Sequence, residues 1–276
     1  MPRTTTARPT AVLLLAAGLL AACGDGADPE AAPGTPASSA AAEPAESLRI
    51  LLVNDDGVVN PAIDVMLGLL SEEDDVDITV VAPAEERSGS SDRTTGGPVP
   101  YREATTPGGA EAWAVDGFPA DAVLVGLDEL DLDPHLVLSG VNPGQNIGPF
   151  AALSGTVGVG RTAIRQGVPA LAVSAGLELD EAQFTFAAEL ARDWIREHRD
   201  ALLDGSAQTA TVTSINVPAC PVPAMGELQE VVRADAFPPG ADPFASTCDL
   251  SGGAPVTDHD ALRAGYPSIT QVPADI

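Results

Sequence analysis

The chain contains no lysine, because all 13 of its basic residues are arginine. This absence excludes chemistries that need a lysine amine, such as a Schiff base or a P-loop that binds phosphate. The chain has only 3 histidines, too few to complete a zinc site with its cysteines. Its net charge is −27 and its arginines are not clustered, so we expect no binding to nucleic acid. An anionic substrate would need a local positive charge, for which a bound cation is the usual source.

Long apolar runs are also scarce. The run at 11–20 follows a basic start, ends shortly before Cys23, and is too short to span a bilayer comfortably. This pattern predicts a secretory signal peptide over residues 1–22. Leu-Ala-Ala-Cys resembles the bacterial lipobox, in which the cysteine is lipidated; the alternative is an ordinary signal peptide with an incidental cysteine. Residues 23–46 are then a lipidated cysteine and a flexible tether rich in Ala, Pro, Gly and Ser.

This interpretation places the protein outside the cell, anchored to the outer face of the cytoplasmic membrane by its lipid alone. The remaining cysteines, Cys220 and Cys248, are then an even pair in an oxidising compartment. Neither belongs to a C-x-x-C motif. We expect a structural disulfide between them, and the alternative is two buried free thiols.

Strand-like and helix-like patterns alternate along residues 47–276, which we interpret as the folded domain. This alternation predicts an α/β, Rossmann-like three-layer fold with a mostly parallel sheet. Residues 82–109 are predicted to form a long polar loop, and the chain beyond 218 an irregular C-terminal extension. Strand-like patterns predict strands at 49–53, which is a continuous apolar run, and at 76–81, 136–138, 170–173 and 211–217. Helix-like patterns predict helices at 61–70, 119–127, 155–166 and 180–198.

Side chains bearing oxygen follow the predicted strands. Asp55 and Asp56 stand together at the end of the first strand, where two carboxylates need a counter-charge. Carboxylates with serine and asparagine oxygens suit a hard cation such as Mg²⁺, Mn²⁺ or Ca²⁺. A Ser-Gly-Thr helix start offers hydroxyl and N–H groups to phosphate. The alternative for each loop is turn or capping chemistry, and Asp with Gly57 is typical of an Asx turn. By contrast, Asp64 and Asp77 are expected to lie on the solvated surface.

Several motifs, in this order, resemble the SurE family of survival proteins, which act as 5′(3′)-nucleotidases. The resemblance spans residues 48–272. The chain departs from the family at several places. Asn60-Pro61-Ala62 replaces the usual Ala-Pro-Gly. Pro149-Phe150 and Leu153 stand where family members often have acidic residues and a tyrosine, respectively. The matching segments are Ile-Leu-Leu-x-Asn-Asp-Asp-Gly at 50–57, Ala-Pro with Arg-Ser-Gly at 82–89, Ser-Gly-Val-Asn-x-Gly-x-Asn-x-Gly at 139–148, Ser-Gly-Thr-Val at 154–157, Asn-Val-Pro at 216–218 and Gly-Tyr-x-Ser-Ile-Thr at 265–270.

The resemblance implies one divalent cation, Mg²⁺ or Mn²⁺, as cofactor. It also implies a nucleotide substrate and a homodimer or homotetramer. Asp55, Asp56 and Asn142 would be catalytic, with Asp55 positioning or deprotonating the nucleophile. The metal ligands would be Asp55, Asp56, Ser88 and Asn142, and the residues around the substrate phosphate would be Asn146, Ser154, Gly155 and Thr156.

These observations favour a metal-dependent phosphomonoesterase that hydrolyses nucleoside monophosphates. A second hypothesis is a surface lipoprotein that binds a metal or nucleotide without turning it over, which the loop departures and export would allow. A third, a purely structural or interaction protein, leaves the group of polar loops unexplained.

Overall fold

The computed structural model describes residues 46–177 and 181–276. The predicted signal peptide, Cys23 and almost all of the predicted tether lie outside these residues. Within the described parts of the chain, no helix has both the length and the apolar character needed to cross a membrane.

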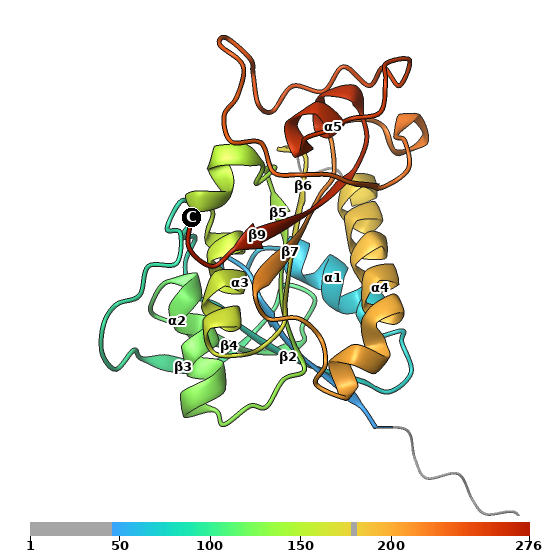
Figure 1. The fold of residues 1–276 in the computed structure, drawn as a ribbon. Coiled ribbons are helices and arrows are strands. Elements are labelled where there is room, and N and C mark those ends of the chain that lie inside the picture. Colours follow the sequence, from blue (N-terminus) through green and yellow to red (C-terminus); the bar gives the residue numbers. More distant parts are fainter. Residues whose placement is uncertain (1–45, 178–180) are drawn as a thin grey trace, which may run out of the picture. The chain divides into compact units, whose positions relative to one another are not determined.

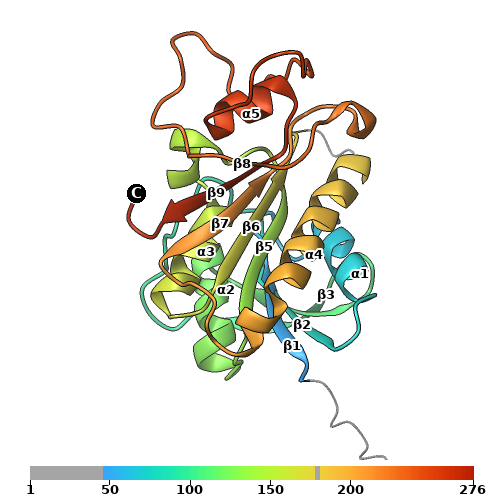
Figure 2. The ribbon, with the colours of Figure 1, turned by 45° about the vertical axis from the view of Figure 1, so that its right-hand side comes forward.

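A mixed, mostly parallel sheet forms the centre of the fold (Figures 1 and 2). Its nine strands among the described residues are arranged in the order β3-β4-β2-β1-β5-β6-β7-β9-β8. Antiparallel pairing occurs only between β3 and β4 and between β7 and β9 in this part of the chain. The α/β fold with a mostly parallel sheet is therefore confirmed. The strands are β1 (Leu48–Val53), β2 (Val76–Pro83), β3 (Tyr101–Thr105), β4 (Glu111–Val115), β5 (Leu136–Pro143), β6 (Ala170–Ala175), β7 (Thr211–Asn216), β8 (Gln229–Glu230) and β9 (Ser268–Pro273).

Helices cover both faces of this sheet. One face packs against α1 (Ala62–Leu70) and α4 (Glu181–Leu203), and the other against α2 (Pro119–Leu124) and α3 (Gly155–Arg165) (Figure 2). Because side chains alternate across a strand, β1 contributes to a separate apolar core on each face. Both faces of β1 are therefore covered, which explains why the strand is a continuous apolar run in the sequence. A π-helical turn (Val125–Glu129) extends α2.

The predicted polar loop at 82–109 is only partly a loop. Its last residues form β3, which pairs antiparallel with β4 at the edge of the sheet. The β3 side chains are mostly exposed, so the strand lacks the apolar alternation that would have revealed it. Asp64 accepts a hydrogen bond from the Gly108 N–H (2.8 Å) in the turn between these strands, whereas Asp77 is exposed.

The prediction of an irregular C-terminal extension is also wrong in part. The extension contains a 3-10 turn (Val222–Ala224), β8, helix α5 (Asp258–Ala264) and β9, which pairs with β7 inside the sheet. Frequent proline and glycine residues, which are typical of turns and loops, make these elements hard to predict from the sequence. One signal was nevertheless present: Thr257 and Asp260 form a reciprocal capping box at the start of α5.

The structure joins Cys220 to Cys248, whose Cα atoms lie 5.8 Å apart. Cys220 follows β7 and is fully buried, and Cys248 lies in the long segment between β8 and α5. The bond therefore ties the middle of the C-terminal extension to the sheet.

Candidate active site

The turn after β1 is closed by Asn54. Its side-chain amide donates to the Gly57 carbonyl (3.0 Å), and its side-chain oxygen accepts from the Gly57 N–H (3.2 Å). Gly57 has φ +96°, a conformation that favours glycine. Because Asn54 makes these bonds, the two aspartates beside it are not the side chains that close the turn.

Asp55 is buried against the start of α3. Its side chain is 3% exposed, and Oδ1 accepts a hydrogen bond from the Thr156 hydroxyl (2.8 Å). A Cβ atom on Gly155 would lie 2.6 Å from Asp55 Oδ2, so this carboxylate approaches the helix where only glycine leaves room. Burial raises the pKa of Asp55, and the Thr156 hydrogen bond opposes that rise.

Asp56 is adjacent to Asp55, and little in the structure offsets the charge of its carboxylate. Its Oδ2 atom is buried and has no hydrogen-bond partner among the described residues. Burial, together with the charges of Asp55 and Glu86, raises the pKa of Asp56 to about 7. Among the ion pairs of the described residues, none places an arginine on either carboxylate. The pair thus lacks the counter-charge that two adjacent carboxylates need.

Asn146 links this site to two further strands. Its amide nitrogen donates to the Thr156 hydroxyl (3.2 Å) and to the Ser174 hydroxyl (2.9 Å). Its backbone N–H donates to Asn216 Oδ1 (2.7 Å). Ser174 and Asn216 were not among the predicted site residues. The signal that could have identified them is the one used for Asp55, a polar residue at the carboxyl end of an apolar strand.

Asn142 is brought to the site by an irregularity in β5. The register between β5 and β6 shifts between Ser139 and Asn142. The Asn142 amide nitrogen then donates to the Gly144 carbonyl (2.6 Å), and the side chain is 7% exposed. Since the nitrogen is held in this way, the side-chain oxygen remains as an acceptor or ligand.

Five of the predicted site residues line one hollow of about 260 Å³. They are Asp55, Ser88, Asn142, Asn146 and Ser154. Ser88 is exposed and its N–H donates to Glu86 (2.6 Å). The Ser154 hydroxyl accepts from the Val157 N–H (3.0 Å) and so caps α3.

Three predicted site residues do not line the hollow itself. Asp56 follows Asp55 in the turn, while Gly155 and Thr156 lie behind the Asp55 carboxylate. Thr156 is fully buried, so in this structure its hydroxyl holds Asp55.

The donor set fits a hard divalent cation. Two carboxylates whose pKa values are raised by burial, one with an unpartnered buried oxygen, would gain from a bound cation. The oxygens of Ser88 and Asn142 line the same hollow as Asp55 and could complete an all-oxygen set. No group of three His, Cys, Asp or Glu side chains suited to a metal occurs among the described residues. A site here would therefore combine the two carboxylates with neutral oxygen ligands, a set that suits a hard cation.

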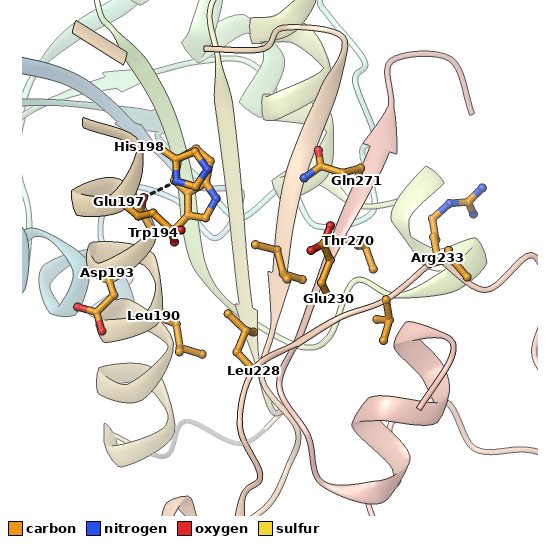
Figure 3. A pocket seen from close by; sticks show the side chains of 13 residues that line it. Leu190, Asp193, Trp194, Glu197, His198, Leu228, Glu230, Arg233, Thr270 and Gln271 are labelled. Atoms are coloured by element: carbon orange, nitrogen blue, oxygen red, sulfur yellow. Dashed lines mark hydrogen bonds between the residues drawn. The ribbon is translucent and has the colours of Figure 1, made fainter. Parts of the chain in front are cut away.

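A second groove, of about 660 Å³, lies between α4 and the strands β8 and β9. Figure 3 shows Trp194 and His198 on one side and Thr270 and Gln271 on the other. The Trp194 and His198 rings are stacked with centroids 4.1 Å apart. None of the predicted site residues lines this groove, so it is separate from the carboxylates.

Comparison with known proteins supports the family suggested by the motifs. Residues 50–235 match the family described as survival protein SurE. The chain is 34% identical over 249 residues to the 5'-nucleotidase SurE of Pelotomaculum thermopropionicum, covering 83% of this chain and 90% of the relative. It is 30% identical over 249 residues to the 5'-nucleotidase SurE of Brevibacillus brevis, covering 83% and 91%. The crystal structure of SurE protein from Aquifex aeolicus matches with a TM-score of 0.65 and 27% identity, covering 83% of this chain and 94% of that one. On these matches, the chain belongs to the SurE family.

Proposed function

We propose that this chain is a divalent-metal-dependent 5'-nucleotidase, which hydrolyses nucleoside monophosphates to a nucleoside and phosphate. The observation that carries the proposal is the adjacent pair of the buried Asp55 and the half-buried Asp56, which has no cationic partner among the described residues and lies beside a hollow lined by neutral oxygen donors. The similar proteins from P. thermopropionicum and B. brevis bear the name 5'-nucleotidase. The family is metal-dependent, and the preference for Mg²⁺ or Mn²⁺ over other cations is part of our proposal.

Asp55, Asp56, Ser88 and Asn142 are the residues that would hold the cation. When bound, the cation would offset the charge of the phosphate and lower the pKa of a coordinated water. The chain's own contribution begins with Asp55. With Oδ1 held by the Thr156 hydroxyl, Oδ2 is the oxygen that orients the attacking water and takes up its proton.

Asn146 supports this arrangement through Thr156. Its amide nitrogen holds Thr156 and Ser174 in one network, so the hydroxyl that fixes Asp55 is itself fixed. Asn142 lines the hollow, and its amide nitrogen, which gives one hydrogen to the Gly144 carbonyl, keeps a second hydrogen that would contact the phosphate oxygens as charge develops. Burial of Asp55 excludes bulk water and strengthens these interactions.

Phosphate release from AMP tests the proposal directly. We expect hydrolysis with Mg²⁺ or Mn²⁺ and its loss after EDTA treatment, with recovery when the cation is returned. Because the cation should neutralise Asp55 and Asp56, it should also raise the melting temperature of the EDTA-treated protein. Binding of cation and nucleotide without phosphate release would instead support the non-catalytic alternative. Hydrolysis that is indifferent to EDTA would contradict the metal site.

We also propose that the protein is exported and lipidated at Cys23, on the basis of the lipobox-like Leu-Ala-Ala-Cys and the basic, apolar segment before it. Cys23→Ser should move the protein from the membrane fraction to the soluble exported fraction, because a lipid is its only proposed anchor. A wild-type protein that is soluble and begins elsewhere than at residue 23 would contradict this. The proposal leaves open a homodimer or a homotetramer, which sedimentation would distinguish.

A further inference from the structure

Polar and apolar side chains both line the hollow beside Asp55, and each set is named here as one end of it. The polar end is formed by the carboxylate, amide and hydroxyl side chains described above. The apolar end is formed by Phe150, Leu153, Leu177 and Phe244, which line the same hollow. A ligand that fills it would therefore need one anionic or polar group and one apolar group. If the proposed function is correct, the polar end takes the phosphate.

The apolar end is built around two stacked aromatic rings. Phe150 and Phe244 have ring centroids 5.3 Å apart and an interplanar angle of 24°. Phe237 meets Phe150 edge to face, with centroids 5.0 Å apart. Phe150 belongs to a 3-10 turn (Gly148–Ala152) that follows Asn146 directly in the chain, whereas Phe237 and Phe244 come from the C-terminal extension.

Two large aliphatic side chains remain exposed at this end. Leu153 is 60% exposed and Leu177 is 55% exposed, so neither is used to fill the core. Single exposed leucines need no explanation, but exposed leucines that line the same hollow as polar side chains are typical of a ligand-binding rim.

The C-terminal extension is held firmly against the 3-10 turn. The buried Asp258 carboxylate accepts hydrogen bonds from the N–H groups of Gly148 (2.9 Å), Ala234 (2.9 Å) and His259 (2.8 Å). Arg233 donates to the Gly148 carbonyl (3.1 Å). These bonds fix the part of the extension that carries Phe237 on the turn that carries Phe150.

The disulfide holds the next part of the extension. Cys248 lies four positions after Phe244 and is bonded to the buried Cys220 beside β7. The aromatic pair therefore joins two segments that are each anchored independently to the domain. Such a surface is largely formed before a ligand arrives, as expected for a small-molecule site.

We propose that Phe150 and Phe244, with Leu153 and Leu177 at the rim, form the platform on which the nucleobase of the substrate stacks. This inference rests on the proposed function, because it assigns the apolar end to the base of the same nucleotide. The four side chains have no hydrogen-bonding groups, so they recognise a base by its flat face and area. Purine nucleoside monophosphates, which have the larger ring system, are the substrate class that this surface favours.

The test compares AMP, CMP and ribose 5-phosphate, which has the sugar and phosphate but no base. Wild-type kcat/KM should be about 10-fold higher for AMP than for ribose 5-phosphate, with CMP between them, because stacking on an aromatic side chain contributes about that factor. Phe244→Ala should remove most of this difference by raising KM for AMP, whereas Phe244→Trp should retain it. Leu177→Asn, a surface change that should not affect folding, should raise KM for AMP several-fold. Tyr101→Ala, which removes a ring from β3 at the other end of the sheet, is the matched control and should leave the ratio unchanged.

Adenosine binding separates this inference from the proposed function. We expect adenosine to bind the wild-type protein and Asp55→Asn alike, and to bind Phe244→Ala about 10-fold more weakly, by calorimetry. A protein that binds adenosine in this way but releases no phosphate from any ester would overturn the proposed function and leave the platform standing. Equal kcat/KM for AMP and ribose 5-phosphate in the wild type, or an equal fall for both in Phe244→Ala, would overturn the platform.

Discussion

Asp55→Asn and Asp56→Asn should each lower cation-dependent phosphate release from AMP by at least ~100-fold, while the protein stays folded. Asparagine keeps the size of the side chain and removes the charge, and a hard cation needs the carboxylate. Asp55→Asn also changes the group that accepts the hydrogen bond from the Thr156 hydroxyl. The turn should survive both changes, because Asn54 makes its hydrogen bonds.

Asp77→Asn is the matched control for these variants, since Asp77 is an exposed aspartate in β2. Activity and melting temperature should be measured together across the three variants. Full activity in Asp55→Asn would show that this carboxylate neither binds the cation nor handles a proton.

Although Asp56→Asn should lower the activity, it should raise the stability of the metal-free protein. The pKa of Asp56 is about 7 in the folded protein and about 3.8 for an ordinary aspartate in water, so the folded state binds this proton more tightly than the unfolded state does. The contribution of Asp56 to stability is therefore fully present below about pH 4 and is lost as the pH rises through 7.

In EDTA at pH 7.5, Asp56→Asn should consequently melt about 4–8 °C above the wild type, from about 2 kcal/mol of relieved desolvation and repulsion. The difference should shrink toward pH 4, and the cation should raise the melting temperature of the wild type but not of the variant. A variant that is less stable than the metal-free wild type at pH 7.5 would contradict the unpartnered state of this carboxylate.

Gly155→Ala should lower activity by at least ~100-fold, although it adds only a methyl group, because a displacement of a catalytic group by about 1 Å can cost that factor. The added Cβ atom would lie 2.6 Å from Asp55 Oδ2 and 2.7 Å from its Cβ atom, so the carboxylate must move. Overpacking of this kind should also reduce the free energy of unfolding by about 1–3 kcal/mol.

Gly68→Ala is the control for helical glycines. Apart from its chain neighbours and the backbone of α1 itself, no atom of the described residues lies within 4 Å of a Cβ built on Gly68 in α1. Alanine should therefore leave activity unchanged and stabilise the helix by about 0.5–1 kcal/mol. Kinetics and thermal melting of both variants test the pair. Wild-type kcat/KM in Gly155→Ala would show that the observed position of Asp55 is not required for catalysis.

Local patterns were sufficient for the central strands and most helices. A continuous apolar run identified β1, since a strand covered on both faces has no polar alternation. Strand-like patterns of the same local kind identified β2. They failed for β3, whose side chains are mostly exposed, and for β9, which lies among prolines and glycines at the end of the chain. Helix α4 was predicted to end near His198 but continues to Leu203, because its last turn still contributes Leu202 to the core.

The sequence by itself determined which oxygen-bearing residues follow the strands, and in what order, and these motifs led to the family. Only the tertiary structure decided how they are used. The bond from Thr156 to Asp55 joins residues 101 positions apart, and those from Asn146 reach β6 and β7. Such contacts depend on the order and register of the strands, which local spacing does not encode. The same is true of Phe244, which reaches the hollow because Asp258 and the disulfide anchor its segment there.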